Sequence, residues 1–471
     1  MADLAVVHVD DKGDRRLRIY SFVADAWAPS VETTLRPEVQ FVDVANIAGL
    51  DRLITYEPGR LNWFDPEPAK ERELAAVTCD FEPPSKGRVL HVDVTHDVNG
   101  DGYDDLVVPD GFGFRVFVQQ SDGEFADPVR VGPSFGRPRV YGADGYRYDP
   151  WSSGRVHEAD YNHDGRGDLI FWNPGSKVRA ASEEKAGFEV HLQNEAGLFE
   201  AETRRFTAEV AFDSDEFAAL AAPEPGRARD TDYVAARDLA GRVLRSIADH
   251  NGDGIADLAV FSLEGPSMFR KRSTYEVHFG TPVPGGTVFA SAISTAIESK
   301  GIPFGIEGHD FDQDGQVDLM LTTVRPTVFK MVGIALRALL ARTLSIELEF
   351  HRLEGGLYAQ KPGAVRQIKA DLPPKEAGGE DPFFPAVLIG DVNGDGHSEL
   401  LMGRSERALH VYRGVPGPEL FAEQATRIGI AMPRDEEHTW LVDLNGDGKQ
   451  DLLMHYPAAR EPQRVAILVA R

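Results

Sequence analysis

The chain has 471 residues, which at about 150 residues per domain would allow about three domains. Apolar residues make up 42% and charged residues 27%, a composition that argues against a disordered, collagen-like or membrane-spanning chain. Acidic residues outnumber basic ones 76 to 50, and the resulting net charge of -26 argues against nucleic acid as a partner and suggests a cation as one.

The first 35 residues carry alternating apolar segments (LAVVHV, RLRIYSF and SVETTL) that predict two or three strands. The N-terminus lacks the basic region and the apolar run of a signal peptide. The sequence contains no apolar run of 18 residues, so no membrane span is predicted. The single cysteine, Cys79, cannot form a disulfide within the chain and is expected to be a small buried side chain.

From residue 97 onward, the pattern Asp-x-Asn/Asp-x-Asp-Gly-x-x-Asp/Glu occurs six times. The copies start at Asp97, Asp160, Asp249, Asp310, Asp391 and Asp443. Each copy precedes an apolar run, and most follow a short alternating segment, so each predicts a hairpin of strand, tight loop and strand. A seventh, degenerate copy keeps acids at Asp43 and Asp51, but Ala45 and Ile47 replace polar residues, so no metal is expected there.

The spacing of these hairpins indicates the fold. They are predicted at 39–56, 89–109, 156–172, 245–261, 306–323, 387–403 and 439–455. The shorter intervals fit a unit of four strands, and the longer ones imply insertions near 213–238 and at an amphipathic helix over 327–344. That helix would pack on the main fold or lie on a membrane surface.

Repeated units of four short antiparallel strands are typical of a β-propeller. We therefore expect an all-β fold in which residues 1–471 form a single propeller domain with seven blades, and eight blades remain possible. An N-terminal strand could complete the last blade, which ends on RVAILVAR.

The loop chemistry favours Ca²⁺, which takes six to eight oxygen ligands, and offers no set of Cys or His ligands for zinc or copper. Positions one, three, five and nine supply side-chain oxygens, position six is a glycine that permits the turn, and position seven offers its carbonyl. An EF-hand is excluded because position twelve is apolar in all six copies. The alternative is an acidic turn that binds no metal. The candidate ligands are Asp97, Asn99, Asp101, Tyr103, Asp105, Asp160, Asn162, Asp164, Arg166, Asp168, Asp249, Asn251, Asp253, Ile255, Asp257, Asp310, Asp312, Asp314, Gln316, Asp318, Asp391, Asn393, Asp395, His397, Glu399, Asp443, Asn445, Asp447, Lys449 and Asp451.

The loops and their flanking strands resemble the FG-GAP/VCBS repeats of integrin-alpha-type β-propellers over residues 39–457. This resemblance implies that positions one, three, five, seven and nine bind Ca²⁺ in the six intact loops, about six structural ions in all. The family's Gly-Ala-Pro signature is poorly kept, so integrin-like partner binding is not implied. We expect a location outside the cytoplasm (secreted, periplasmic or cell surface), because weak extracellular-type calcium sites would be filled there. The missing signal peptide leaves a cytoplasmic location as the alternative.

No catalytic residue is assigned. The G-x-S-x-G match at 132–136 lacks the helix that a nucleophile elbow needs, and the RGD at 166–168 uses a predicted metal ligand. The segment 133–154 is rich in Tyr, Trp, Arg and Gly, so it either contacts a ligand or packs on its own aromatics. Its candidate ligand contacts are Tyr141, Tyr146, Tyr148 and Trp151. We expect a monomeric binding module for a protein or carbohydrate, or alternatively a polysaccharide lyase or hydrolase with its active site in the propeller funnel.

Overall fold

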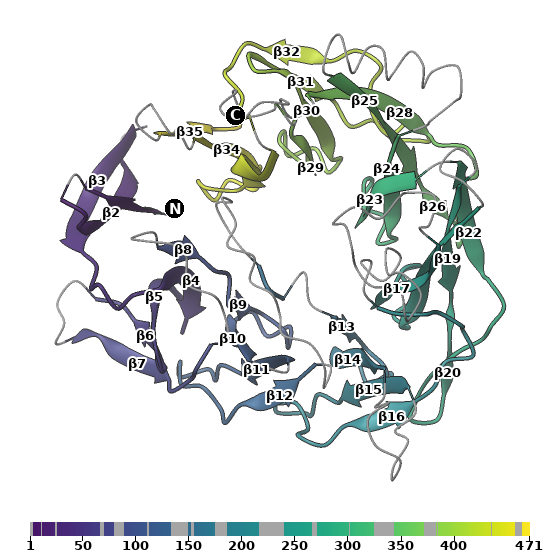
Figure 1. Cartoon of the computed structure of the whole chain (residues 1–471), viewed down its shortest axis with the longest axis horizontal. Helices are drawn as coiled ribbons and strands as arrows, with labels where there is room; N and C mark the ends of the chain where they lie inside the picture. Colours follow the sequence, from purple (N-terminus) through teal and green to yellow (C-terminus); the bar gives the residue numbers. More distant parts are fainter. Residues whose placement is uncertain are drawn as a thin grey trace, which may run out of the picture. The chain divides into compact units, whose positions relative to one another are not determined.

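The fold is taken from a computed structural model of the chain (Figure 1). It describes residues 3–10, 12–23, 26–65, 70–79, 89–110, 113–132, 149–151, 155–174, 186–215, 240–265, 271–300, 302–324, 343–371, 383, 385–434, 436–456 and 464–471. The chain forms two compact units. The first comprises residues 1–209, 254–256 and 280–288, and the second comprises residues 210–253, 257–279 and 289–471.

The first unit contains four antiparallel sheets built from strands that are consecutive in the chain. The first sheet is β1 (Leu4–Val9), β2 (Arg15–Val23) and β3 (Ala26–Thr34). The second is β4 (Phe41–Ile47), β5 (Leu50–Glu57), β6 (Arg60–Trp63) and β7 (Arg72–Ala75), to which β8 (Leu90–His91) adds in parallel. The third is β9 (Thr95–His96), β10 (Asp105–Asp110), β11 (Gly113–Phe117) and β12 (Val129–Val131), and the fourth is β13 (Val156–Ala159), β14 (Asp168–Asn173), β15 (Gly187–His191) and β16 (Arg204–Phe206).

The second unit repeats this construction in four further sheets. They are β17 (Gly241–Ala248), β18 (Asp257–Glu264), β19 (Arg272–His278) and β22 (Thr295–Lys300); β23 (Ile302–His309), β24 (Asp318–Val324), β25 (Thr343–His351) and β28 (Ala364–Asp371); β29 (Val387–Gly390), β30 (Glu399–Ser405), β31 (Ala408–Tyr412) and β32 (Thr426–Ile428); and β33 (Thr439–Val442), β34 (Asp451–Tyr456) and β35 (Arg464–Leu468). Two short hairpins, β20 (Gly280–Val283) with β21 (Gly286–Phe289) and β26 (Leu353–Glu354) with β27 (Leu357–Tyr358), and the 3₁₀ turn η5 (Glu436–His438) complete the described elements.

This series of up-and-down sheets is the strand arrangement of a β-propeller, and the prediction of an all-β fold is confirmed. Eight blade-like sheets occur in the described residues, so the preferred count of seven was wrong. The N-terminal strands β1–β3 form a sheet of their own, and the last sheet consists of β33–β35. The count of seven rested on the acidic motif, which the turns of the first sheet lack.

The degenerate copy at Asp43 has a different turn from the six intact copies. Strands β4 and β5 pair up to Ile47 and Leu50, and only Ala48 (φ 52°) and Gly49 (φ 80°) connect them. Two left-handed residues are typical of a type I′ hairpin turn, which leaves no room for a metal loop. Asp43 lies inside β4 instead, where its carboxylate accepts hydrogen bonds from Val94 N and Thr95 Oγ1.

The insertions predicted from the long intervals lie mostly outside the described residues. Only 213–215 of the first are described, and Thr343 and Leu344 of the second begin β25. In the part of the chain that the structure covers, no helix has the length and hydropathy to cross a bilayer.

The core lies between neighbouring sheets, because the side chains of a central strand point alternately to its two faces. Leu106 and Val108 of β10 pack with Ile54 of β5, whereas Val107 packs with Leu169 of β14. Cys79 is buried in the first of these clusters, as expected for a small apolar side chain. Because both faces of the second strand are covered, its first residue is held in a buried position, and this residue is position nine of the acidic motif.

Candidate metal loops and a polar pocket

Each acidic loop joins the first and second strands of its sheet, and position nine is the first residue of the second strand. All six side chains at position nine are 0–2% exposed. They are Asp105, Asp168, Asp257, Asp318, Glu399 and Asp451. A carboxylate at this depth needs hydrogen bonds, and the main chain supplies them.

One oxygen of the position-nine carboxylate accepts the backbone N–H of position two in every loop, at 3.0–3.2 Å. The other oxygen accepts an N–H from the segment that follows the third strand of the same sheet, at 2.7–3.1 Å in five of the sheets. In the first loop the two donors are Val98 and Gln119. Position nine therefore clamps the loop to the third strand, a role that the sequence pattern did not reveal.

Burial raises the pKa of four of these clamp carboxyls. The pKa rises to about 7 in Asp105, to about 6 in Asp168 and to about 7 in Asp318, and that of Glu399 is also raised. Desolvation is the largest cause, and two carboxylates of the same loop, Asp97 and Asp101 in the first, raise the pKa further. A cation among these acids would relieve the repulsion.

The loops share a backbone conformation with two left-handed residues. Position six is a glycine with φ of 79–86° in all six loops, as predicted. Position four is left-handed as well, and there it is glycine in four loops but His163 (φ 64°) and Gln313 (φ 57°) in the other two. The glycines at position four of four loops are a sequence signal for this left-handed conformation, which was not predicted.

Side chains at positions three and five approach each other in five of the loops, and in the loop that starts at Asp391 the Nδ2 of Asn393 donates to Glu399 at 2.6 Å. In the first loop, the Asp97 carboxylate accepts N–H groups of Asp101 (3.0 Å) and Gly102 (2.9 Å), and Asn99 Nδ2 donates to Asp101 Oδ2 at 3.0 Å. The Asn-to-Asp contact recurs at 2.9–3.1 Å in the loops that start at Asp160, Asp249 and Asp443. In the fourth loop, Asp310, Asp312 and Asp314 place one oxygen each within 4.8 Å of one another.

The donor set therefore fits Ca²⁺. Positions one, three and five of each loop offer oxygen-bearing side chains beside a buried carboxylate, and Ca²⁺ accepts such ligands in a flexible shell that water can complete. At position seven, the backbone N–H of Tyr103, Arg166, Gln316, His397 and Lys449 donates to the position-five carboxylate. Bound Ca²⁺ would balance part of the negative charge of these acid clusters.

Three loops already hold a guanidinium against a position-three or position-five acid. Arg166, at position seven of the second loop, pairs with Asp164. Arg352 pairs with Asp312 and approaches Asp314 at 3.9 Å, and Arg413 pairs with Asp395 at 2.9 Å. The six loops are therefore not equivalent toward a cation.

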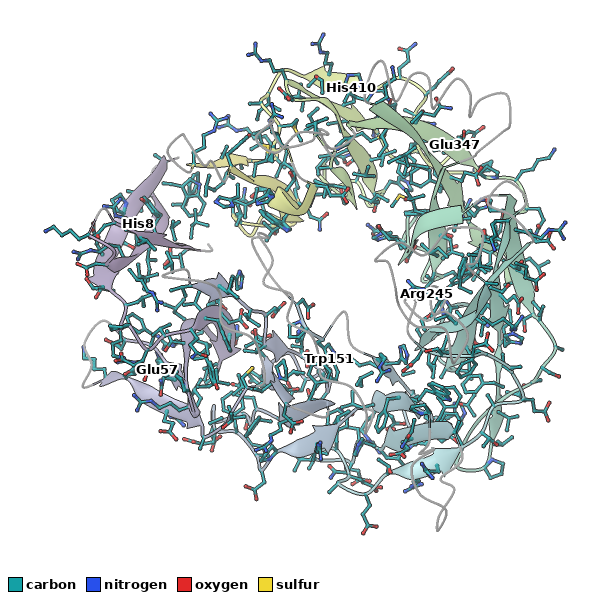
Figure 2. The ribbon with its side chains drawn as sticks, in the orientation of Figure 1. His8, Glu57, Trp151, Arg245, Glu347 and His410 are labelled. Atoms are coloured by element: carbon teal, nitrogen blue, oxygen red, sulfur yellow. The ribbon has the colours of Figure 1, made fainter. Side chains whose placement is uncertain are left out.

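The predicted ligand segment is only partly described, since Tyr141, Tyr146 and Tyr148 lie outside the described residues. Trp151 is 7% exposed and belongs to the core (Figure 2). Its ring packs edge-on against Phe114 at 4.9 Å, and its Nε1 donates to Glu158 at 2.8 Å. This indole supports the fold rather than offering an exposed aromatic surface to a ligand.

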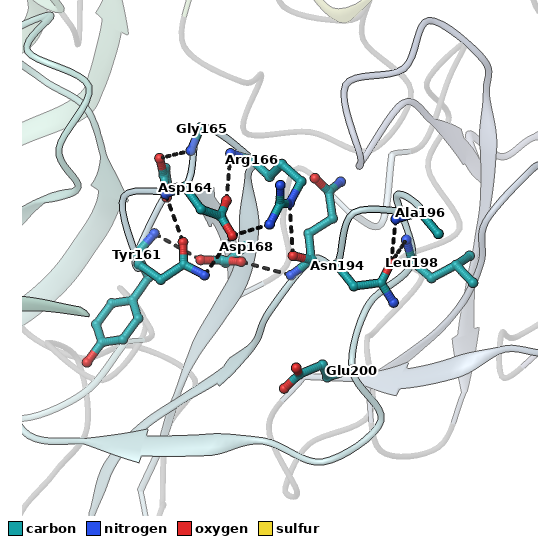
Figure 3. A network of polar contacts seen from close by, with 12 residues as sticks. Tyr161, Asp164, Gly165, Arg166, Asp168, Asn194, Ala196, Leu198 and Glu200 are labelled. Atoms are coloured by element: carbon teal, nitrogen blue, oxygen red, sulfur yellow. Dashed lines mark hydrogen bonds and ion pairs between the residues drawn. The ribbon is translucent and has the colours of Figure 1, made fainter. Parts of the chain in front are cut away.

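A polar pocket of about 410 Å³ lies beside the second loop (Figure 3). It is lined by Asn162, Asp164, Arg166, Leu192, Gln193, Asn194, Glu195, Glu200, Arg204 and Gly285. Arg166 Nε donates to the Gln193 carbonyl at 3.2 Å, so the guanidinium connects the loop to the turn after β15.

The turn itself is held by Asn194, whose Oδ1 accepts N–H groups of Ala196 and Leu198 at 2.9 and 3.2 Å. The sequence analysis missed this pocket. Its signal was a second repeat, Gln-x-x-x-Gly-x-Phe at 119–125 and 193–199, in which an isolated bridge joins the Gln and Phe of each copy.

Comparison with known proteins identifies the repeat. Residues 391–454, which hold the fifth and sixth loops, match the family described as FG-GAP-like repeat, so the predicted resemblance is confirmed over these residues. The chain thus combines the strand arrangement of a β-propeller with an FG-GAP-like repeat match in its last part. A comparison with curated proteins gives no significant match.

Two solved structures serve as examples of matches to this chain. A lectin from Agrocybe aegerita that recognises non-reducing terminal N-acetylglucosamine is 17% identical, with 93% of this chain and 92% of that chain covered and a TM-score of 0.39. A Bacillus licheniformis rhamnogalacturonan lyase is 11% identical, with 97% of this chain and 73% of that chain covered and a TM-score of 0.34. Scores this low carry no argument about function, which must come from the site.

Proposed function

We propose that this β-propeller is a non-enzymatic binding module that holds a carbohydrate in the polar pocket beside the second loop, while Ca²⁺ in the acidic loops stabilises the fold. The pocket is the observation that supports this proposal. Its volume of about 410 Å³ falls in the range of about 300–1,000 Å³ found for small-molecule sites.

The chemistry of the lining favours a ligand rich in hydroxyl groups. Amides, carboxylates and guanidinium groups from Asn162, Glu200 and Arg204 offer both donors and acceptors, and a sugar hydroxyl can use both. None of the residues that line this pocket is aromatic, so hydrogen bonds rather than ring stacking would select the ligand. A polar site of this size can hold one or two sugar rings.

Calcium enters the proposal as a structural ion. Extracellular modules bind it with Kd of about 10⁻⁴–10⁻³ M, and sites of that strength would be filled outside a cell. We therefore place the protein outside the cytoplasm as part of the same proposal. Three predicted ligands, Asn162, Asp164 and Arg166, also line the pocket, so ion binding at the second loop would order one wall of the site.

A glycan array in 2 mM Ca²⁺, followed by calorimetry with the best glycan, tests the proposal. Arg204→Gln should weaken binding roughly 10-fold, the loss of about 1.4 kcal/mol expected for one charge-assisted hydrogen bond. Arg205→Gln is the matched control. Arg205 is the next residue on β16 but pairs with Glu189 at 2.9 Å and does not line the pocket.

The outcomes that would reject this function are distinct. Failure to bind any glycan, or equal losses from the two variants, would remove the pocket as a carbohydrate site. Cleavage of a bound glycan, measured as new reducing ends or unsaturated products, would replace the binding module with the alternative of a lyase or hydrolase.

A further inference from the structure

A second group of potential metal ligands lies outside the acidic loops, in the first unit. His96 ends β9, Asp93 precedes it by three residues, and Asp149 comes from the segment before β13. His96 Nε2 lies 3.4 Å from Asp149 Oδ1 and 3.8 Å from Asp93 Oδ1. One atom from each of the three residues lies within 4.8 Å of the others.

Neighbouring backbone groups hold the two carboxylates in place. Asp149 Oδ1 accepts the N–H of Trp151 at 2.8 Å, and Asp93 Oδ1 accepts that of Thr95 at 3.4 Å. Asp93 is 2% exposed, whereas the side chains of His96 and Asp149 are 20% and 27% exposed. The group is thus fixed on its inner side and open on its outer side.

His96 Nε2 is buried and faces both carboxylates, but at 3.4 and 3.8 Å it forms no short, well-aligned hydrogen bond with either of them. A buried ring nitrogen that is only weakly bonded is costly. A metal ion between the three ligand atoms would bind this nitrogen and both carboxylates at once.

The local charge also favours a cation. Besides Asp93 and Asp149, the carboxylates of Asp43 and Glu158 act electrostatically on His96. Glu158 receives the indole N–H of Trp151, and Asp43 is approached by His91 Nε2 at 3.1 Å. Four acids therefore act on His96, and their negative potential favours a cation beside its ring nitrogen.

We propose that Asp93, His96 and Asp149 form a binding site for a transition-metal dication, with Zn²⁺ as the preferred ion and water or a ligand completing the shell on the open side. An imidazole nitrogen favours Zn²⁺ over Ca²⁺, and two carboxylates suit it as further ligands. Bonds of about 2.0–2.2 Å to N and O ligands would fit between atoms separated as these are. This site does not depend on the proposed carbohydrate pocket.

Calorimetric titration of the metal-stripped, Ca²⁺-saturated protein with Zn²⁺ tests this site. Wild type should bind one equivalent of Zn²⁺ that excess Ca²⁺ does not displace. His96→Gln should weaken this event at least 10-fold. His309→Gln is the matched control, because His309 also directly precedes a loop and contacts a carboxylate, Glu307 at 3.3 Å, but has no second acid at this distance in the described residues.

Asp149→Asn provides a second variant if His96→Gln fails to fold, as judged by circular dichroism and thermal melting. It should also weaken Zn²⁺ binding at least 10-fold with an unchanged melt. The proposal is overturned if wild type binds no equivalent of Zn²⁺ in excess Ca²⁺, or if the folded ligand variants bind it as wild type does.

Discussion

Arg352 directs its guanidinium onto the carboxylate of Asp312, at position three of the fourth acidic loop. The side chains are only 16% and 12% exposed, so the pair is sheltered from water. Arg352 follows His351, the residue of β25 that pairs with Leu319. The residues at the equivalent place in the other five sheets with acidic loops are Val118, Leu192, Phe279, Arg413 and Val469. Only two of these six positions are basic, which distinguishes the fourth and fifth loops.

Replacing Arg352 should strengthen calcium binding at the fourth loop. Arg352→Leu introduces the residue found at the equivalent position 192 and removes a charge that competes with the ion. We expect roughly 10-fold tighter binding there, since a 1.4 kcal/mol change is a factor of ten. Equilibrium dialysis over a series of free Ca²⁺ concentrations should show one additional ion bound at low calcium.

Arg413→Leu provides the comparison for this experiment. The Arg413 side chain is 70% exposed, so solvent screens its pair with Asp395 and the change in calcium binding should be under about 2-fold. Equal binding curves for wild type and Arg352→Leu would show that the guanidinium does not compete with calcium.

Position nine should matter for stability even without metal. Asp105→Ala removes the acceptor for the N–H groups of Val98 and Gln119 and leaves both buried. At about 1–3 kcal/mol for each of the two unsatisfied groups, we expect a loss of roughly 2–6 kcal/mol in urea unfolding with EDTA present. Asp101→Asn, which alters an exposed loop acid, should cost less than about 1 kcal/mol under the same conditions.

Asp101→Asn should show its main effect when calcium is present. This variant should lose the stabilisation that its loop gains from added Ca²⁺, although it costs little in EDTA. If Asp105→Ala were as stable as wild type in EDTA, the clamp role of position nine would be rejected.

The sequence predicted the features that repeat and missed those that depend on a single partner. The six loops and their glycines at position six follow from local chemistry, and the structure places them between adjacent strands as the pattern indicated. The eighth blade was missed because β1–β3 are connected without the acidic motif, although their strands were recognised.

Other features could not be derived from local patterns because they join distant segments. Gln119 binds the carbonyl oxygens of Asn46 and Asp104, and Asp149 reaches His96 across more than fifty residues. The interpretation of Asp43 and Asp51 as loop positions failed for the same reason, since only the pairing of β4 with β5 shows a two-residue turn. The exposed role predicted for Trp151 depended on a fold that buries it instead.

Chelation should destabilise the whole protein. A site that binds only the folded state adds RT ln(1 + [Ca²⁺]/Kd), or about 1.4 kcal/mol when free calcium is ten times Kd. Several filled loops should therefore raise the melting temperature by several degrees when Ca²⁺ is added to EDTA-treated protein. Mg²⁺ should have a much smaller effect because it requires shorter bonds and stricter octahedral geometry. An unchanged melt with no bound ion would identify the loops as acidic turns without metal.

Acid should weaken the fold partly through two buried histidines. His191 and His351 are each 2% exposed, and their Nδ1 atoms donate to the carbonyls of Glu200 and Ala359 at 2.8 Å. Burial lowers the pKa of both imidazoles below the ordinary value of 6.5, so the unfolded chain takes up protons more readily than the folded protein. Their contribution to stability is therefore full above pH 6.5 and is lost as the pH falls below it.

Thermal melts of Ca²⁺-saturated protein between pH 8 and pH 5 test whether the melting temperature falls as the pH drops below 6.5. Saturating calcium keeps the loop carboxylates ionised. Their protonation, which would favour the folded state as the pH falls and so oppose the histidine effect, then contributes less to the change of melting temperature with pH. His191→Gln keeps a polar group near the Glu200 carbonyl but cannot take up a proton, so its melting temperature should fall less steeply below pH 6.5 than that of wild type. A surface control, His309→Gln on β23, should leave the slope close to that of wild type, because the His309 side chain is 40% exposed and solvent reaches its ring. Parallel slopes for wild type and His191→Gln would instead assign the acid sensitivity to calcium release from the loops.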